Sequence, residues 1–590
     1  MRTVRSLFIP ALLSFAGLIG TTARAGSDFD TWAENLAAQR MRADPVMSTR
    51  MQYFQGEEQA PLDGRWEEIA KPAKLDEVRR DRLALAELHR FDANTLTPTQ
   101  RDSLGLINWT LAQSIAAAEY LDTGYLFEQM DGLQVRSINF MSQQQPLRNA
   151  RDLRSYLQRL SGLSRLMDQG IERARAAQAK GVLMPRFITE EVIAQFEAFL
   201  APRPAQNVLV TSLADRMERI HGLSPQAREV TRAKAERIVA DRVLPAWRRG
   251  LALMREQLPL TTDDAGVWRL KNGAAFYAAM LRKSTTTEYT PAQIHAIGLA
   301  EVARIEAQMD GLLRQLGYVK GSVKDRYARM NADRQPKAAD PRPDLLARYT
   351  SILRDAEARS RLLFDVLPKA PVEVRREPAL TEATAAAHYT LPAPDGSRPG
   401  IFWAPLPGPE FDVGRMRTLV YHETVPGHHF QASIQQEAQD LPHFRRTMAF
   451  GWYSGYGEGW ALYAEQLAAE NGWYEGDPVG QLGQLSDALF RARRLVVDTG
   501  LHAMKWTRQQ AIDYGIPTTE VDRYVVWPGQ ACAYMLGRLK IESLRDRAKA
   551  ALGDRFDIRK FHSLVLLTGN VPLKVLEDTV DRWIKAQQEG

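Results

Sequence analysis

Cysteine is almost absent from this sequence, and no block of one charge sign interrupts it. The only cysteine is Cys532, so no intramolecular disulfide can form and no cysteine cluster can bind a metal. No histidine stands close to it in the sequence, which favours a small buried hydrophobic residue over an activated thiol. Basic runs with interleaved aromatic residues are also missing, and the net charge is only +6. We therefore expect no nucleic-acid partner.

Long apolar runs are missing as well, apart from one near the N-terminus. Arg2 and Arg5 precede an apolar stretch at 7–19, which is shorter than the roughly 20 residues of a membrane span. An A-R-A cleavage site follows at 23–25. The pattern predicts a signal peptide cleaved near Ala25 and a periplasmic or secreted protein. No cysteine stands at the cleavage site, so we expect no stable membrane anchor after cleavage; an uncleaved anchor is the alternative.

Helical periodicity dominates the chain between residues 29 and 370. Apolar residues recur at spacings of three and four over 152–177, with charges on the opposite face. Thr290 followed by proline is typical of an N-cap and predicts a long amphipathic helix through Arg314. With 45% hydrophobic residues, 25% charged residues and no internal repeat, the composition is that of a globular protein. These features predict a mainly α fold.

A change of amino-acid composition between residues 368 and 409 predicts a small sheet. Proline, glycine and alanine become frequent there, and 387–391 and 400–404 are compatible with strands. The P-D-G-S turn signature at 394–397 lies between them and predicts a hairpin. We expect a single large domain over residues 26–590, with a helical lobe at about 26–370 and a lobe holding the sheet and a metal site at about 371–590.

The most informative stretch is Y-H-E-T-V-P-G-H-H-F-Q, residues 421–431. Three of the ten histidines fall within eight residues, and a glutamate directly follows the first. In the zinc hydrolase motif H-E-x-x-H, one helical turn brings two imidazoles to one ion, and the glutamate handles the proton of the attacking water. Here Pro426 and Gly427 stand where the second histidine is expected.

The spacing of these histidines excludes chelation from an unbroken helix. His422 and His428 are six residues apart and point to different sides, whereas His429 is seven residues from His422 and about 10 Å away along the axis. The Pro-Gly pair predicts a local bulge that returns His428 to the four-apart position. We predict His422 and His428 as metal ligands and keep His429 as the alternative second ligand. Glu423 is then placed to act as general base.

A third ligand must come from elsewhere, and Glu458 in Y-G-E-G-W-A-L-Y-A-E (456–465) is the best candidate. Its flanking glycines predict a turn that opens an apolar helix. A carboxylate there needs a partner, because burying an unpaired charge is costly. A role as a simple helix cap is the alternative. Glu465 lies two turns further on the same face; it could support the site, but we expect it to be solvated.

Two further side chains are candidates for catalysis. Asp498 and His502 are four residues apart on one helical face, and a histidine oriented by a carboxylate is a common oxyanion donor. An ordinary pair on a helix surface is the alternative. Tyr534 follows a Pro-Gly turn and could donate a hydrogen bond to a tetrahedral oxyanion; a buried aromatic is the alternative. The candidate catalytic residues are thus Glu423, His502 and Tyr534.

Together and in this order, H-E-T-V-P-G-H-H, E-G-W-A-L-Y-A-E, D-T-G-L-H and W-P-G-Q-A-C-A-Y resemble the bacterial proteins grouped as domain of unknown function 885. The resemblance spans almost the entire mature chain. That family is similar to a remote branch of the gluzincin metallopeptidases, with further similarity to the carboxypeptidase Taq and tyrosine carboxypeptidase groups. The resemblance implies a large helical metallopeptidase-like fold with a cleft and short peptides as substrates. It also implies His422, His428 and Glu458 as ligands and Glu423 as base.

These patterns predict a secreted peptidase that uses one Zn²⁺ ion, a metal suited to imidazole and carboxylate ligands. The strand at 388–391 is expected to pair with an extended peptide substrate. One alternative is a metal-dependent amidase or esterase acting on a cell-wall or small-molecule substrate. Another is a non-catalytic periplasmic binding protein with a structural metal, which a fourth protein ligand such as His429 would favour.

Overall fold

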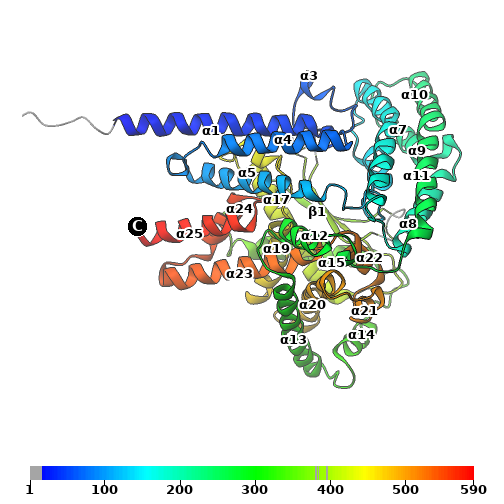
Figure 1. Cartoon of the computed structure of the whole chain (residues 1–590). Helices are drawn as coiled ribbons and strands as arrows, with labels where there is room; N and C mark the ends of the chain where they lie inside the picture. Colours follow the sequence, from blue (N-terminus) through cyan, green and yellow to red (C-terminus); the bar gives the residue numbers. More distant parts are fainter. Residues whose placement is uncertain (1–15, 379–381, 383–384, 394–395, 397, 590) are drawn as a thin grey trace, which may run out of the picture.

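The protein is built almost entirely of helices, as Figure 1 shows. The computed structural model describes residues 16–378, 382, 385–393, 396 and 398–589. The helices of the first part of the chain are α1 (Ala16–Ala43), α2 (Pro45–Met51), α3 (Gly56–Gln59), α4 (Lys71–Leu88), α5 (Pro98–Ala117), α6 (Leu133–Asn139), α7 (Ala150–Gln178), α8 (Arg186–Leu200), α9 (Val208–Met217), α10 (Pro225–Ile238) and α11 (Leu244–Gln257).

The rest of the chain alternates long and short helices around three strands. Before and within the sheet region lie α12 (Gly273–Thr285), α13 (Pro291–Gln315), α14 (Val323–Asp333), α15 (Arg342–Ser360), β1 (Val372–Arg376), β2 (His388–Thr390) and β3 (Gly400–Ala404). After it come α16 (Met416–Glu423), α17 (His428–Glu437), α18 (His443–Arg446), α19 (Ser454–Glu470), α20 (Pro478–Ala503), α21 (Arg508–Asp513), α22 (Thr518–Val526), α23 (Ala533–Leu552), α24 (Ile558–Thr568) and α25 (Leu573–Glu589). The mainly α prediction is confirmed.

Local sequence signals explain the long helices. The side chain of Thr290 accepts a hydrogen bond from the Gln293 N–H while the Gln293 side chain caps the Thr290 N–H, a reciprocal box that starts α13 where predicted. Helix α7 covers the predicted amphipathic segment and buries Tyr156, Leu160 and Leu163 on one face. Both predicted helices are confirmed.

The sheet has the strand order β1-β3-β2. β2 and β3 are antiparallel, with Tyr389 opposite Phe402, as the hairpin prediction requires. β1 runs parallel to β3, a pairing that the sequence did not indicate. Of the predicted turn at 394–397, only Gly396 belongs to the described residues. Within this sheet β2 is an end strand, so one of its edges is not paired with a strand of the sheet.

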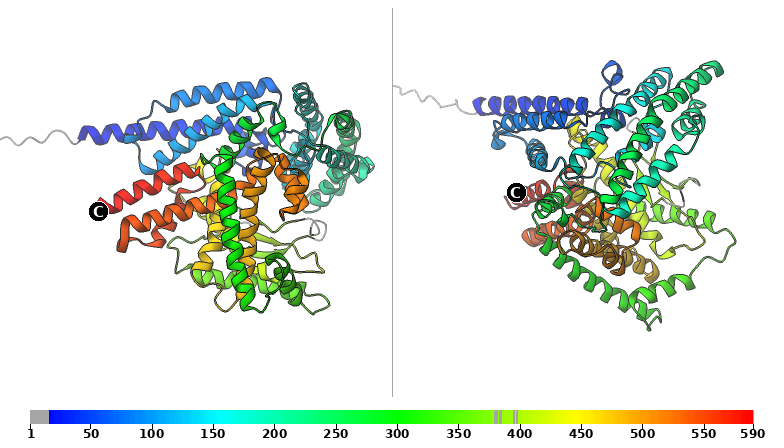
Figure 2. Two further views of the ribbon diagram at one scale, coloured as in Figure 1. Left: turned by 60° about the horizontal axis from the view of Figure 1, so that its bottom comes forward. Right: turned by 45° about the vertical axis from the view of Figure 1, so that its right-hand side comes forward.

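Within the part of the chain that the structure describes, three hydrophobic cores hold the helices together, and each draws residues from both sides of residue 370. The first joins α1, α4 and α5 to α16–α19 and α23–α25, and the second joins α6–α11 to α20–α22. The third joins α12–α14 to α20 and α23, and it buries Cys532 as predicted. In Figure 2, α13 lies alongside α20, which packs against it over most of its length.

The helices α7–α11 form one end of the molecule, next to α1 and α4 (Figures 1 and 2). α17 and α19 lie near the middle. Among the helices of the described residues, none combines the length and the apolar character that crossing a bilayer requires.

Candidate metal centre

The predicted motif helix consists of two helices rather than one helix with a bulge. α16 ends at Glu423, and Thr424 leaves helical geometry with φ −120° and ψ −98°. α17 then begins at His428. A Cβ on Gly427 would lie 2.0 Å from the carbonyl oxygen of His422, so only glycine fits this close approach. The indole N–H of Trp460 donates to the Pro426 carbonyl at 2.9 Å and holds the intervening loop against α19.

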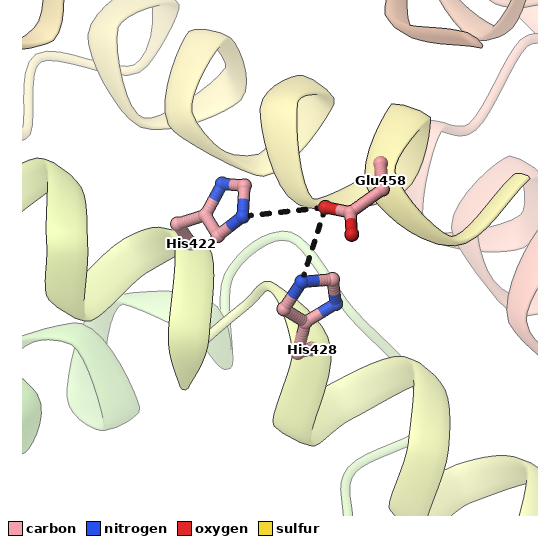
Figure 3. A group of neighbouring side chains, drawn as sticks. All are labelled: His422, His428 and Glu458. Atoms are coloured by element: carbon pink, nitrogen blue, oxygen red, sulfur yellow. Dashed lines mark ion pairs between the residues drawn. The ribbon is translucent and has the colours of Figure 1, made fainter. Parts of the chain in front are cut away.

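This break turns three side chains from three helices toward one point (Figure 3). His422 comes from α16, His428 from α17 and Glu458 from α19. Their Nε2 atoms lie 3.6 Å (His422) and 3.5 Å (His428) from Oε2 of Glu458. One donor atom from each residue lies within 4.8 Å of the other two. The structure therefore brings together the three predicted ligands.

The donor spacing fits a zinc ion better than it fits direct hydrogen bonds. Hydrogen bonds between nitrogen and oxygen are about 2.7–3.2 Å long, shorter than both observed separations. Tetrahedral zinc with bonds of about 2.0–2.2 Å sets neighbouring donors about 3.3–3.6 Å apart. Two imidazoles, one carboxylate and an open fourth position form the donor set of hydrolytic zinc enzymes.

Glu465 is part of this centre, which corrects the expectation that it is solvated. Its side chain is buried, and its Oε1 lies 2.7 Å from Nδ1 of His422. A carboxylate on Nδ1 holds a proton there, so Nε2, which faces Glu458 and His428, is the nitrogen that could bind a cation in exchange for its own proton. Glu465 thereby orients His422 as a candidate ligand.

Ion pairing governs the titration of the ligands. Burial alone would lower the pKa of His422, but the adjacent carboxylates of Glu458 and Glu465 outweigh it and raise that pKa to about 10. Burial would raise the pKa of Glu458, yet the two imidazoles hold it well below its usual range. The carboxylates of α16 and α19 thus concentrate negative charge around two histidines, an arrangement that favours a cation.

His429 does not belong to the donor set. Its Nε2 donates to the Ala370 carbonyl at 3.1 Å, and its Nδ1 lies 2.9 Å from the Tyr389 hydroxyl and 3.2 Å from that of Ser433. Burial lowers the pKa of His429 to about 4, so the ring is neutral. With both nitrogens engaged, His429 ties α17 to β2 and to the segment before β1. The closed site that a fourth ligand from His429 would form is not present.

Glu423 lies beside the ligands at the end of α16. Burial raises the pKa of Glu423. The nearby His422 and His428 lower this pKa in part, and His388 of β2 is close enough to lower it too. The His388 side chain is about half exposed. The sheet therefore comes next to the metal centre, with an end strand and an accessible imidazole beside Glu423.

The glycines around Glu458 lie inside α19 and form no turn, which corrects the sequence-based expectation. Glu458 sits in the second turn of this helix, so it is not a cap. A Cβ on Gly459 would lie 2.6 Å from the backbone of Gly537 in α23, and a Cβ on Gly537 would lie 2.0 Å from the Gly455 carbonyl oxygen. The glycines let α19 and α23 cross in backbone contact.

Comparison with known proteins places the chain in a family. Residues 45–580 match the bacterial proteins of unknown function described as DUF885.

The chain belongs to the DUF885 family. One similar structure is a "putative lipoprotein" from Colwellia psychrerythraea, 30% identical, with a TM-score of 0.87 over 95% of this chain and 99% of that one. A second, from Shewanella oneidensis and described as "a putative lipoprotein of unknown function", is 17% identical, with a TM-score of 0.69 over 93% and 99% of the two chains. No curated protein matches the sequence.

In this DUF885 member, Asp498 and His502 are both buried, but their side chains hydrogen-bond to other residues and not to each other. Asp498 accepts hydrogen bonds from the Tyr277 hydroxyl at 2.6 Å and from the Gly529 N–H at 3.0 Å. His502 accepts at Nδ1 from the Val267 N–H and donates from Nε2 to a backbone carbonyl at 2.9 Å. The expected pair is not formed, and both nitrogens of His502 are committed to backbone atoms. Its side chain fixes the packing of α20.

Tyr534 lies on α23, close to the crossing with α19. Its hydroxyl is 3.3 Å from Nη2 of Arg523, and the guanidinium of Arg494 lies 4.4 Å from the centre of its ring. Among the described residues, its hydroxyl makes no hydrogen bond to the three ligands. Its predicted role as oxyanion donor stays a prediction, and its neighbours are two arginines.

Trp452 is a site residue that the sequence did not indicate. Its ring centre lies 6.3 Å from that of His428, and the side chain is 44% exposed. A Cβ on Gly457 would lie 2.0 Å from Cζ2 of Trp452, so this glycine provides the space for the indole. An exposed indole beside a ligand offers an apolar wall to a bound molecule. The chain has twelve tryptophans, and nothing in the sequence distinguishes Trp452 from the others.

Proposed function

We propose that this protein is an exported zinc-dependent peptidase that hydrolyses short peptides. The observation that carries the proposal is the convergence of three donor atoms: Oε2 of Glu458 lies 3.5–3.6 Å from Nε2 of His422 and of His428, and all three donors lie within 4.8 Å of one another. Glu423 directly follows one of these residues. A bound zinc ion supplies Lewis acidity that polarises a carbonyl group and lowers the pKa of water. The donor set fits this ion.

The residues of the chain have distinct tasks in such a reaction. Glu423 takes the proton of the attacking water and passes it to the leaving amine. Glu465 keeps His422 in the required tautomer and orientation. The edge of β2 that no strand of the described residues pairs with accepts an extended peptide by adding a strand to the sheet, and His429 secures β2 through Tyr389. Trp452 forms an apolar wall for a substrate side chain.

Export is supported by two independent features. The N-terminal sequence has the pattern of a signal peptide. The similar structures from Colwellia and Shewanella are described as lipoproteins, a class of exported proteins. We therefore propose that the enzyme meets its peptides outside the cytoplasm.

The test combines metal analysis with hydrolysis of a mixed peptide library. Purified protein is expected to contain one zinc per chain and to cut peptides in a way that a chelator abolishes and added zinc restores. Glu423→Gln should retain zinc and lose cleavage, whereas Glu475→Gln, at an exposed position, should match the parent. Cleavage of ester or amide substrates without any peptide would favour the amidase or esterase alternative. Metal without turnover of any of these substrates would favour a binding protein.

A further inference from the structure

A cluster of buried arginines, on α20 and α22, has more positive charge than its partners neutralise. Arg494 on α20 and Arg523 on α22 both pair with Glu520, at 2.8 Å and 3.4 Å. Arg494 also donates to the Tyr524 hydroxyl at 2.9 Å. Two guanidinium groups thus share one carboxylate, which leaves one positive charge in excess within this group.

Two donors of this cluster have no hydrogen-bond partner. Nη1 of Arg494 and Nε of Arg523 are buried, and no acceptor is found for either among the described residues. The Arg494 side chain is only 6% exposed. A buried guanidinium N–H without an acceptor costs free energy, because it has lost its water and gained nothing in return. An anionic ligand that accepts from Nη1 would remove this cost.

The cluster is linked to the proposed reaction centre through helices that pack against each other. Tyr534 stacks on Arg494 and lies one helical turn before Gly537, where α23 touches the backbone of α19. Glu458 stands in α19 between the glycines of that contact. Helix α20, which carries Arg494, packs against both α16 and α19. The Glu520 side chain is 25% exposed, so the cluster reaches solvent on one side.

We infer that Arg494 and Arg523 form a subsite for the free C-terminal carboxylate of the peptide substrate. A carboxylate is planar, carries one negative charge and accepts several hydrogen bonds, which matches a fork of guanidinium donors with one excess charge. The Tyr534 hydroxyl, held by Arg523, provides a further donor to the same group. The inference rests on the proposed peptidase function and narrows it to substrates with a free carboxyl end.

The test compares peptides that differ only at their C-terminus. The zinc-containing full chain is assayed with a cleaved peptide as the free acid and as the C-terminal amide. We expect kcat/KM for the acid to exceed that for the amide by about 30-fold or more, because a buried charged donor is left unpaired by the amide. Equal values for the two peptides would overturn the subsite while leaving the peptidase function intact.

Variants test whether Arg523 is responsible for the preference for the free-acid peptide. Arg523→Gln is expected to reduce the preference for the acid to less than about threefold, with most of the change in the acid reaction. Arg493→Gln is the matched control: this neighbour of Arg494 pairs with Glu306 at 2.7 Å and should keep the full preference. A preference that survives Arg523→Gln and Tyr534→Phe unchanged would contradict the assignment.

A binding measurement separates the subsite from the reaction. Calorimetry with an N-acetylated dipeptide and its amide, on the Glu423→Gln variant, requires no turnover. Binding of the acid alone, lost in Arg523→Gln, supports the carboxylate subsite even if no peptide is ever cleaved. Equal binding of acid and amide contradicts it even if cleavage is found.

Discussion

The histidines of the metal centre and those of the cores differ in the partners of their ring nitrogens. In both groups the rings are largely buried. His502 and His562 have protein partners on both nitrogens; His562 bonds to the Tyr463 hydroxyl at 2.9 Å and the Leu363 carbonyl at 2.8 Å. His422 has such a partner only on Nδ1, and its Nε2 faces the donors of two other helices. From this difference we infer that a ring nitrogen facing other donors, rather than burial or a nearby acid, distinguishes the candidate ligand from the packing residues.

The backbone explains why only one group has free nitrogens. His502 lies within a continuous helix and His562 within another, and the segments packed around them supply hydrogen-bond partners at fixed positions. At the centre, the chain leaves helical geometry between Glu423 and His428, so two imidazoles approach from different helices and meet a carboxylate from a third. Substitutions at Glu423, Glu465, His562 and His429 test whether the two groups of histidines differ in this way.

The largest expected effect is on catalysis, in Glu423→Gln. Removing the general base should lower kcat by about 10²–10⁴-fold, because the proton of the attacking water loses its acceptor. Zinc content should not change, since Glu423 is not a ligand. Peptide hydrolysis and metal analysis on the same preparation check both statements. A variant as active as the parent would remove Glu423 from the mechanism.

Next in size is the effect of Glu465→Gln on the affinity for zinc. Because Glu465 orients His422 and holds the proton on Nδ1, its loss should weaken zinc binding by about 10–100-fold. A competition titration with a chelator measures the change. Glu470→Gln, near the end of the same helix and exposed, serves as control and should bind zinc as the parent does.

The core histidines should instead affect the dependence of stability on pH. Burial lowers the pKa of both His502 and His562 from 6.5 to about 4. The neutral form of each buried ring therefore contributes its full share to the free energy of unfolding above pH 6.5. This contribution, up to about 3 kcal/mol for each ring, declines as the pH falls and is lost by about pH 4. Urea unfolding between pH 7 and 4 should show a smaller loss of stability in His562→Gln than in the parent. The exposed His221→Gln should keep the parent slope, and an unchanged slope in His562→Gln would contradict the account.

The smallest effect is expected from His429→Gln. Loss of the hydrogen bonds to Ala370 and Tyr389 should lower the free energy of unfolding by about 1–3 kcal/mol. Zinc affinity should stay within a few-fold of the parent value. Denaturant unfolding and the chelator titration measure the two quantities. A loss of zinc as complete as that of His428→Ala would show that His429 is a ligand after all.

The sequence sufficed for features that depend on local patterns. Caps and periodicity predicted α7 and α13, and strand-compatible segments around a turn signature predicted the β2–β3 hairpin. The spacing of His422 and His428 excluded a regular helix, although the interruption was predicted as a bulge and is the boundary between two helices. Glu458 was found because a carboxylate among apolar residues needs a partner. The parallel pairing of β1 with β3 escaped prediction because it depends on contacts distant in the sequence.

The errors have one physical origin, which is that side-chain partners come from other helices. The solvated position expected for Glu465 was wrong because α16 covers it and brings His422 to its carboxylate. The expected Asp498–His502 pair failed because Tyr277, Gly529, Val267 and Tyr524 offer each residue closer partners. The glycines of α19 serve a helix crossing with α23, 80 residues further on, rather than a turn.

The most direct test of the metal centre is an anomalous-scattering map of crystals grown with zinc. We predict one strong peak bounded by Nε2 of His422, Nε2 of His428 and a carboxylate oxygen of Glu458, each about 2.0–2.2 Å from the ion. A peak at His429, or none at these three residues in the presence of excess zinc, would contradict the account.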